Sequence, residues 1–259
     1  MKIKHLLCFI ALCLFFTPGK AQQLSVMTLR NGATVYIWED KSKPDVFGMI
    51  AFKVGSVDDP EQYTGLAHYL EHVMFKGTQT IDALDWEKEK PIYEKIIAKY
   101  DERAALSDPA AREAIDKEIN DLTREAAQYA AGNEFSLLVD HMGGQGLNAS
   151  TGYDQTEYHN SFPPSQLEKW LEIYSERLID PVFRGFQTEL EAVYEEYNMY
   201  NDDRGSRMRE FIYEQAFGDH PYARPIIGLP EHLKNPQLSK LIDFYNTWYG
   251  PQNMSIILV

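Results

Sequence analysis

Hydrophobic and polar residues alternate along the first part of the chain in a way that is typical of β-strands. Two runs rich in β-branched residues flank Asn31-Gly32, a dipeptide that favours a β-hairpin turn. Residues 46–56 indicate a third strand, and a helix is expected from about Thr64 to Gly77, a natural terminating residue. The apolar residues of this helix recur at helical spacing and form one stripe: Leu66, Tyr69, Leu70, Val73 and Met74.

Residues from about 86 to 131 change character. They are rich in Ala, Glu, Lys, Asp and Arg, and their apolar residues recur at helical spacing. The segment 107–111 interrupts this pattern with a capping residue, Ser107 or Asp108, followed by Pro109 in the first turn of a new helix. We therefore expect two antiparallel helices, an amphipathic hairpin inserted between the rest, with its charges on a solvated face.

The remainder of the chain returns to strands and then to helices. Gly143-Gly144 predicts a turn before two short strands that end near Phe162. Helical patterns follow at residues 163–183, 188–217 and 236–249. The second of these is expected to break between Asp203 and Gly205. The chain finishes in an apolar β run with no turn after it, which suggests a fragment of a longer chain.

The composition fits a globular protein and narrows its partners. The 259 residues are 44% hydrophobic, which is enough to bury a core. The formal net charge is −14, and the body of the chain has no basic cluster. This charge argues against nucleic acid as a partner and gives no reason to expect binding to an anionic membrane surface.

Residues 1–21 are typical of an export signal. Lys2 and Lys4 precede an apolar stretch, residues 6–16, that is too short to span a bilayer. Gly19 and Ala21 place small residues three and one before the expected cut. We therefore expect an exported protein, periplasmic or, as the alternative, secreted.

The mature chain, residues 22–259, is predicted to contain neither disulfides nor a membrane-spanning segment. Both cysteines, Cys8 and Cys13, lie in the predicted signal, so the core or a metal must hold the exported protein together. No other apolar run approaches 18 residues, so stable membrane insertion of the mature chain is not expected.

The helix near residue 70 carries a possible reaction centre. His68 and His72 are four residues apart, so both imidazoles lie on one face and can reach one metal ion. Glu71 points to nearly the same side and can take a proton from a metal-activated water. Paired histidines on a helix can also be ordinary polar surface. The apolar flanks favour the metal site, because buried polar atoms need partners.

A second, acidic helix offers the further ligand that zinc needs. Glu189 and Glu196 are seven residues apart and share a face, whereas Glu191 and Glu195 point elsewhere. One carboxylate could bind the metal, and the other could orient a histidine. Spacing alone favours a solvent-exposed acidic helix over a metal ligand.

Residues 65–78, Gly-Leu-Ala-His-Tyr-Leu-Glu-His-Val-Met-Phe-Lys-Gly-Thr, resemble the signature of the inverzincin peptidases, the pitrilysin/insulinase family M16. The resemblance extends over nearly the whole mature chain, since further segments fit the family's N-terminal catalytic domain in order: residues 143–159, 167–183, 191–199, 220–233 and 244–259. It implies an α+β fold, a mostly antiparallel β-sheet packed with helices, interrupted by the helical hairpin at about 86–131. It also implies one zinc ion for this domain.

The resemblance assigns roles to the candidate residues. His68 and His72 match the two histidine ligands, Glu71 matches the general base, and Glu196 matches the third zinc ligand. Glu189 matches the supporting acid seven residues earlier, and the choice of Glu196 over Glu195 rests on this match and on the face that Glu189 shares.

The resemblance also implies where a substrate lies. Asn148 and Ala149 match the edge strand along which such enzymes bind an extended peptide, where backbone pairing gives affinity without strong sequence selection.

The chain departs from the family pattern in two respects. His72 and Glu196 are 124 residues apart, more than is usual in the family, and the hairpin accounts for the difference. Family members also use a second homologous half, in cis or in trans, which this sequence does not contain.

Three functions follow as hypotheses. The first is a zinc endopeptidase that hydrolyses peptides or unfolded segments. The second is a non-catalytic M16-like subunit that binds peptides or an assembly partner. The third is a metal-dependent binding or storage module.

Overall fold

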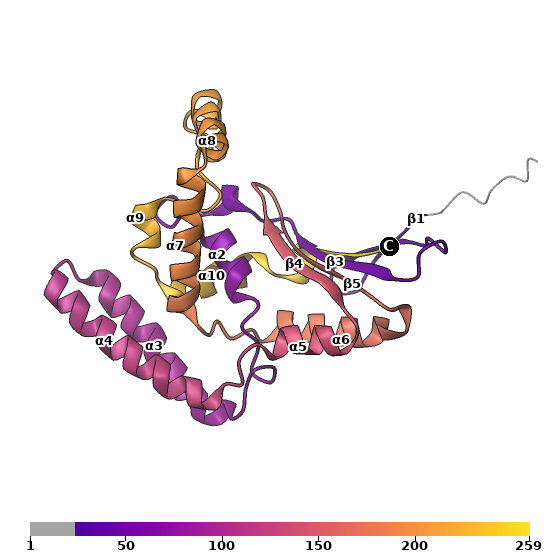
Figure 1. The fold of residues 1–259 in the computed structure, drawn as a ribbon, viewed down its shortest axis with the longest axis horizontal. Helices are drawn as coiled ribbons and strands as arrows, with labels where there is room; N and C mark the ends of the chain where they lie inside the picture. Colours follow the sequence, from indigo (N-terminus) through magenta and orange to yellow (C-terminus); the bar gives the residue numbers. More distant parts are fainter. Residues whose placement is uncertain (1–23) are drawn as a thin grey trace, which may run out of the picture.

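A six-stranded β-sheet organises the molecule (Figure 1). The computed structural model describes residues 24–259, so the predicted export signal lies outside the described residues. The strands follow the order β1-β2-β6-β3-β5-β4. Their bounds are β1 Leu24–Thr28, β2 Thr34–Trp38, β3 Val46–Phe52, β4 Gln145–Thr151, β5 Thr156–Phe162 and β6 Met254–Leu258. Neighbouring strands are antiparallel except for β2 and β6, so the predicted mostly antiparallel sheet is confirmed.

The last strand of the described chain pairs with two strands from its beginning. The turn at Asn31-Gly32 connects β1 to β2, and Gly32 takes the left-handed φ of 97° that such a turn requires. The apolar run at the end of the sequence forms β6, which lies between β2 and β3. This strand pairs on both sides, and its position explains its nearly continuous hydrophobic sequence.

Helices cover one face of the sheet and extend beyond its β4 end (Figure 1). Those outside the hairpin are α2 Leu66–Val73, α5 Glu134–His141, α6 Leu167–Ile179, α7 Phe186–Asp202, α8 Arg204–Phe217, α9 Pro230–Leu233 and α10 Leu238–Trp248. Trp170 of α6 is fully buried and stacks on Phe162 of β5 and on Tyr174. In Figure 1, α2 lies between the sheet and α7, and α8 projects away from the body.

Helix α2 is shorter than the sequence predicts. Its regular part ends at Val73 rather than continuing to Gly77. The amides of Phe75 and Lys76 bond to carbonyls three residues back, so the last turn tightens. Gly77 then adopts a φ of 88°, so the glycine ends the turn that follows the helix rather than the helix itself.

The predicted helical hairpin is confirmed. Helix α3 covers Trp86–Ala105 and α4 covers Pro109–Ala126. Asp108 caps α4 by accepting a hydrogen bond from the amide of Ala111 at 3.0 Å, and Pro109 occupies the first turn. Most of the hairpin's charged side chains are exposed. The buried residues of both helices are mainly apolar and include Ile92, Ile96, Tyr100, Ile115 and Ile119.

Two helices were not predicted. Helix α5 precedes the glycine turn, and its signal was a short run of apolar positions, Phe135, Val139 and Met142, all of them buried. The four-residue α9 begins at Pro230 and carries no periodic signal. The predicted break of the acidic helix is confirmed, because Asp203 separates α7 from α8 and caps the latter.

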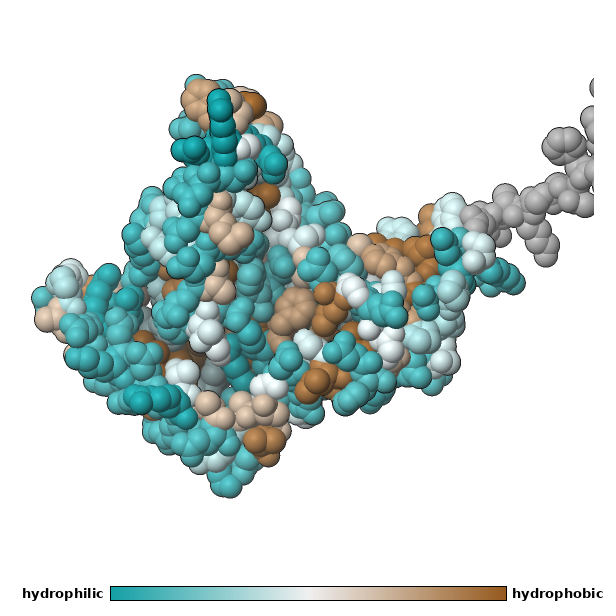
Figure 2. All heavy atoms as spheres, viewed as in Figure 1, coloured by the Kyte–Doolittle hydropathy of each residue, from teal (hydrophilic) through white to brown (hydrophobic). Residues whose placement is uncertain are grey.

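Exposed apolar side chains gather at two places, the β1 end of the sheet and the projecting α8 (Figure 2). On α8 they include Met208, Phe211 and Ile212. Within residues 24–259, no helix combines the length and the apolar character that crossing a membrane requires.

Candidate metal centre

Helix α2 is held at both ends. At its start, the buried carboxylate of Asp59 accepts hydrogen bonds from the amides of Gly65 and Ala67, at 2.7 and 2.9 Å. These bonds satisfy donors that the first turn leaves free. At its end, the guanidinium of Arg177 donates a hydrogen bond to the carbonyl of Met74 at 2.9 Å. The helix therefore presents its side chains from a fixed position.

The structure brings His68 and His72 of α2 together with Glu196 of α7. One oxygen of Glu196 lies 3.7 Å from Nε2 of His68 and 3.5 Å from Nε2 of His72. One ligand atom from each of the three residues lies within 4.8 Å of the others. Two nitrogens and one carboxylate oxygen therefore converge from two helices that are far apart in the sequence.

This geometry fits a zinc ion. In a tetrahedral site with bonds of about 2.1 Å, two ligand atoms lie about 3.4 Å apart. The two distances to Glu196, 3.5 and 3.7 Å, are close to that value. The donor set of two imidazoles and one carboxylate is also the His₂Glu set of catalytic zinc sites, which leaves a position for water.

Glu189 lies next to this group, on the Nδ1 side of His72. Its carboxylate is 3.5 Å from Nδ1 of His72 and 2.5 Å from Nζ of Lys76. His72 thus has a carboxylate beside each ring nitrogen, which is the arrangement in which an outer carboxylate can orient a metal-binding histidine. His68 differs, because within residues 24–259 no hydrogen-bond partner lies beside its buried Nδ1.

The surroundings shift the pKa values of the two histidines in opposite directions. Burial lowers the pKa of His68 to about 4, so its imidazole is neutral at pH 7 and can donate a lone pair. Burial opposes a charge on His72 as well, but hydrogen bonds with Glu189 and Glu196 outweigh it and raise the pKa of His72 to about 9. In the metal-free protein His72 is therefore protonated, and a metal must displace that proton.

Glu71 lies outside the ligand group and bonds to the sheet. Its carboxylate accepts a 2.7 Å hydrogen bond from the hydroxyl of Thr151, the last residue of β4. Burial raises the pKa of Glu71, which brings a carboxylate closer to the range useful for proton transfer near neutral pH.

Asn148 and Ala149 lie in β4, the strand at one edge of the sheet. Within the described residues β4 pairs only with β5, so its other side is open. The strand ends at Thr151, beside Glu71, and a cleft of about 180 Å³ opens there between His68, Thr151, Tyr153 and residues of α8. The last residue of β4 and one member of the metal group, His68, therefore line the same cleft.

Glu191 and Glu195 are exposed and lie apart from the metal group, as the facing of the acidic helix predicts. Sequence reasoning did not find Thr151, Lys76 or Arg177. Thr151 stands three residues after Asn148 in a predicted strand, which was the only signal for it. Arg177 lies on the buried face of α6 among apolar residues, where no spacing rule points to a cation.

The chain matches the model of the insulinase family, peptidase family M16, over residues 34–90 and 122–229. The unmatched stretch between them, residues 91–121, falls within the α3–α4 hairpin, so this hairpin is an insertion relative to the family model.

Curated and solved relatives point the same way. The chain is 25% identical to the zinc protease PqqE of Helicobacter pylori over 90% of its own length and 42% of the relative's. A protease from Helicobacter pylori has a similar structure, with a TM-score of 0.69, 22% identity and coverage of 92% of this chain and 46% of that one. The first half of the periplasmic protease PqqL from Escherichia coli gives a TM-score of 0.66, 23% identity and coverage of 92% and 43%.

These comparisons establish the relationship and its extent. The chain spans about two fifths of the length of PqqE, and the structural neighbours share its fold. The family model covers more than half of the chain, including α2 and α7 with the group at His68, His72 and Glu196. The chain therefore belongs to the insulinase family of peptidases, family M16.

Proposed function

We propose that this chain is the catalytic half of a zinc-dependent endopeptidase that hydrolyses peptides or unfolded segments. The observation that carries the proposal is the convergence of His68, His72 and Glu196 at distances suited to zinc, with Glu71 beside them and not among them. Relatives named as zinc proteases support the same class of activity.

Each residue has a distinct part in this proposal. His68, His72 and Glu196 hold the zinc, and Glu189 orients His72 while Lys76 balances its charge. When bound, zinc supplies Lewis acidity, which lowers the pKa of a water toward about 7 and polarises the peptide carbonyl. Glu71 accepts the proton of the attacking water and delivers it to the departing amine. Thr151 keeps the carboxylate of Glu71 aimed into the cleft.

The proposed substrate is an extended peptide that pairs with β4 at Asn148 and Ala149. Backbone groups on the open side of an edge strand offer hydrogen bonds to a further strand. Because β4 leads directly to Thr151 and Glu71, a peptide added to this edge runs past the metal group.

The proposed enzyme contains a second homologous half, on the same chain or on a partner. Its relatives are longer than this chain, which covers 42% of PqqE and 43% of the first half of PqqL, whose fold it shares. We also propose a periplasmic location, with secretion as the alternative, on the basis of the signal-like residues 1–21 and the periplasmic relative. Sequencing the N-terminus of protein recovered from a periplasmic extract tests this, and a start at Gln22 is expected.

The test of activity is Glu71→Gln in the full-length protein together with its second half. Removal of a general base is expected to lower cleavage of a quenched peptide by about 10²–10⁴-fold. Zinc content should stay at one ion per catalytic domain, because Glu71 is not a ligand. Glu61→Gln, at an exposed position, is the matched control and should cleave normally. Zinc retained by the wild-type protein with no cleavage of any peptide would contradict the proposal.

A further inference from the structure

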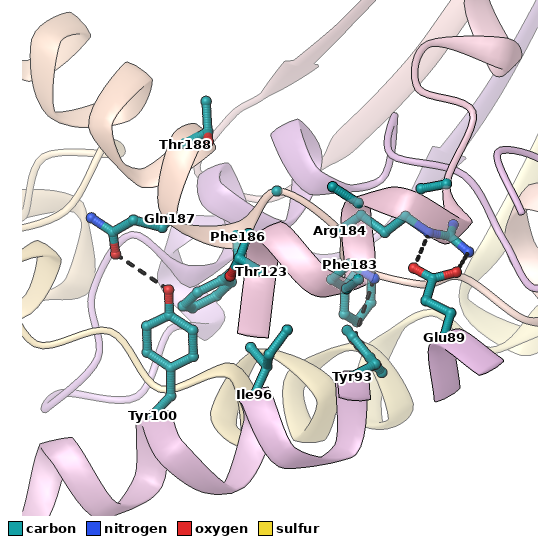
Figure 3. Close-up of a pocket in the computed structure, with 14 residues that line it drawn as sticks. Glu89, Tyr93, Ile96, Tyr100, Thr123, Phe183, Arg184, Phe186, Gln187 and Thr188 are labelled. Carbon is teal, nitrogen blue, oxygen red and sulfur yellow. Dashed lines mark hydrogen bonds and ion pairs between the residues drawn. The ribbon is translucent and has the colours of Figure 1, made fainter. Parts of the chain in front are cut away.

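A cavity of about 270 Å³ lies between the hairpin and the segment that leads into α7 (Figure 3). Tyr93, Ile96 and Tyr100 of α3 form one wall, and Phe183 to Thr188 form the opposite one. The three α3 residues belong to the stretch that the family model leaves out. The cavity is therefore a feature of this chain's insertion, separate from the metal group.

The charged groups and the tyrosine hydroxyls around the cavity are already paired, and the side chains of Thr123 and Thr188 complete the polar part of its lining. Arg184 donates two hydrogen bonds to the carboxylate of Glu89, at 2.6 and 2.7 Å, and Glu89 is only 2% exposed. The hydroxyl of Tyr93 accepts a bond from the amide of Phe183, and the hydroxyl of Tyr100 donates to Gln187, both at 3.3 Å. Figure 3 shows the Glu89–Arg184 pair at one end and the Tyr100–Gln187 pair at the other.

This pairing decides what the cavity can hold. A buried water needs two to four polar partners, and few are free here, so water fills the space poorly. An anion or a cation would also lack a free counter-charge, because Glu89 and Arg184 neutralise each other. What remains on the walls is mainly apolar surface with two threonine side chains, which favours a neutral guest.

The walls also favour an aromatic guest over an aliphatic one. Tyr93, Tyr100, Phe183 and Phe186 all contribute rings to the lining. Tyr100 and Phe186 already meet edge to face, with centroids 4.7 Å apart, and a further ring can extend such an arrangement. Beside them Gly185 leaves open space, since a side chain carbon there would meet no atom within 4 Å.

We propose that this cavity binds a small, neutral aromatic molecule with one or two fused rings. The guest contacts α3 on one side and, on the other, Gly185 and Phe186, where α7 begins. Binding therefore braces the inserted hairpin against the helix that carries Glu189 and Glu196. The proposal concerns binding alone and does not depend on the proposed peptidase activity.

Phenol and indole are the probes, added to the full-length protein as purified, and ligand-detected NMR measures their binding. Saturable binding is expected, with benzoate and benzylamine binding about tenfold more weakly or worse because they carry charge. Phenol should slow amide hydrogen exchange in residues 93–100 and 183–190, which locates the site. Absence of saturable binding, or equal binding of the charged analogues, contradicts the proposal.

Two variants fill the cavity, one from α4 and one from the residue that directly follows it. Thr123→Phe and Ala127→Phe each place a ring at the wall, and either should weaken phenol binding about tenfold or more. Asn120→Phe adds the same ring one turn before Thr123 at an exposed position outside the lining, and should leave affinity within about twofold. Circular dichroism identifies any variant that does not fold, and the other filling variant then decides. Unchanged phenol affinity in a folded filling variant shows that the ring binds elsewhere.

Discussion

Two helix pairs in this molecule are built on opposite principles. Helices α3 and α4 follow one another in the sequence, and a common apolar face with exposed ion pairs holds them together. Helices α2 and α7 are far apart in the sequence. Besides the aromatic contact of Tyr69 with Phe186, they meet through half-buried polar groups, His72 with Glu189 and Glu196. The first pair lies largely outside the family model and the second lies within it.

The difference between the two pairs indicates where charged side chains affect stability or metal binding. A solvated ion pair contributes little to stability, so the hairpin depends on its apolar face. Around His72 the charges are partly removed from water, and they raise its pKa to about 9. Stability should therefore follow apolar burial in the hairpin, whereas metal affinity should follow individual carboxylates in the α2–α7 pair.

The largest difference in zinc affinity is expected between variants of two neighbouring acids of α7, Glu195 and Glu196. Glu196→Gln removes one of three protein ligands, and zinc affinity should fall by about 10²–10³-fold, since each ligand contributes a few kcal/mol of the total. Glu195→Gln changes the adjacent, exposed residue and should leave affinity within about twofold. Titration against a zinc chelator measures both. A larger loss in Glu195→Gln than in Glu196→Gln would show that the third ligand was assigned wrongly.

In the hairpin, the largest effect should come from an apolar residue. Ile119 is 2% exposed, so Ile119→Ala leaves a cavity and should destabilise the protein by about 2–4 kcal/mol. Denaturant midpoints measure this change. Zinc affinity of the folded variant should stay near the wild-type value, because Ile119 does not belong to the metal group. A variant that loses zinc affinity while folded would mean that the two helix pairs are coupled.

The pH dependence of metal binding tests the paired charges around His72. Zinc must displace the proton of His72, whose pKa is raised to about 9 in the metal-free protein. Apparent zinc affinity should therefore rise about tenfold per pH unit from pH 7 to 9 and level off above about 9. His68 adds nothing in this range, because its pKa is lowered to about 4. Chelator titrations at several pH values give the slope.

Glu189→Gln is the control for that slope. It removes one of the two carboxylates that raise the pKa of His72, so the affinity should level off at a lower pH. The raised pKa of His72 also affects the stability of the metal-free fold. Because the folded-state pKa exceeds the unfolded value near 6.5, protonated His72 stabilises the fold fully below pH 6.5, and this contribution is lost as pH rises through about 9. An unchanged pH profile in Glu189→Gln would remove Glu189 from this role.

The same contrast explains what could be predicted from the sequence. The hairpin was predicted almost to its ends, because its periodicity, cap and Pro109 are local signals that pairing between neighbours reinforces. The end of α2 was predicted four residues too late. The helix tightens after Val73, where the distant Arg177 donates a hydrogen bond to the carbonyl of Met74. Local propensity carries no information about such a partner.

For the site, spacing placed His68, Glu71 and His72 on one helix and Glu189 with Glu196 on another. Their convergence depends on the sheet, which no periodicity reveals, and the family resemblance supplied it. Thr151 shows what remained hidden. A threonine at the end of a strand is unremarkable in sequence, and only the position of β4 beside α2 brings its hydroxyl to Glu71.

The smallest expected effect completes the comparison between the two pairs. Lys99 of α3 forms an ion pair with Glu102 of the same helix at 2.8 Å and, across the hairpin, with Glu118 of α4 at 2.7 Å. Both acids are about half exposed. Lys99→Ala should therefore change the free energy of unfolding far less than Ile119→Ala, since water and salt screen such pairs. Denaturant midpoints at low and high salt measure the change, which should shrink at high salt. A loss comparable to that of Ile119→Ala would mean that the hairpin, too, depends on its charges.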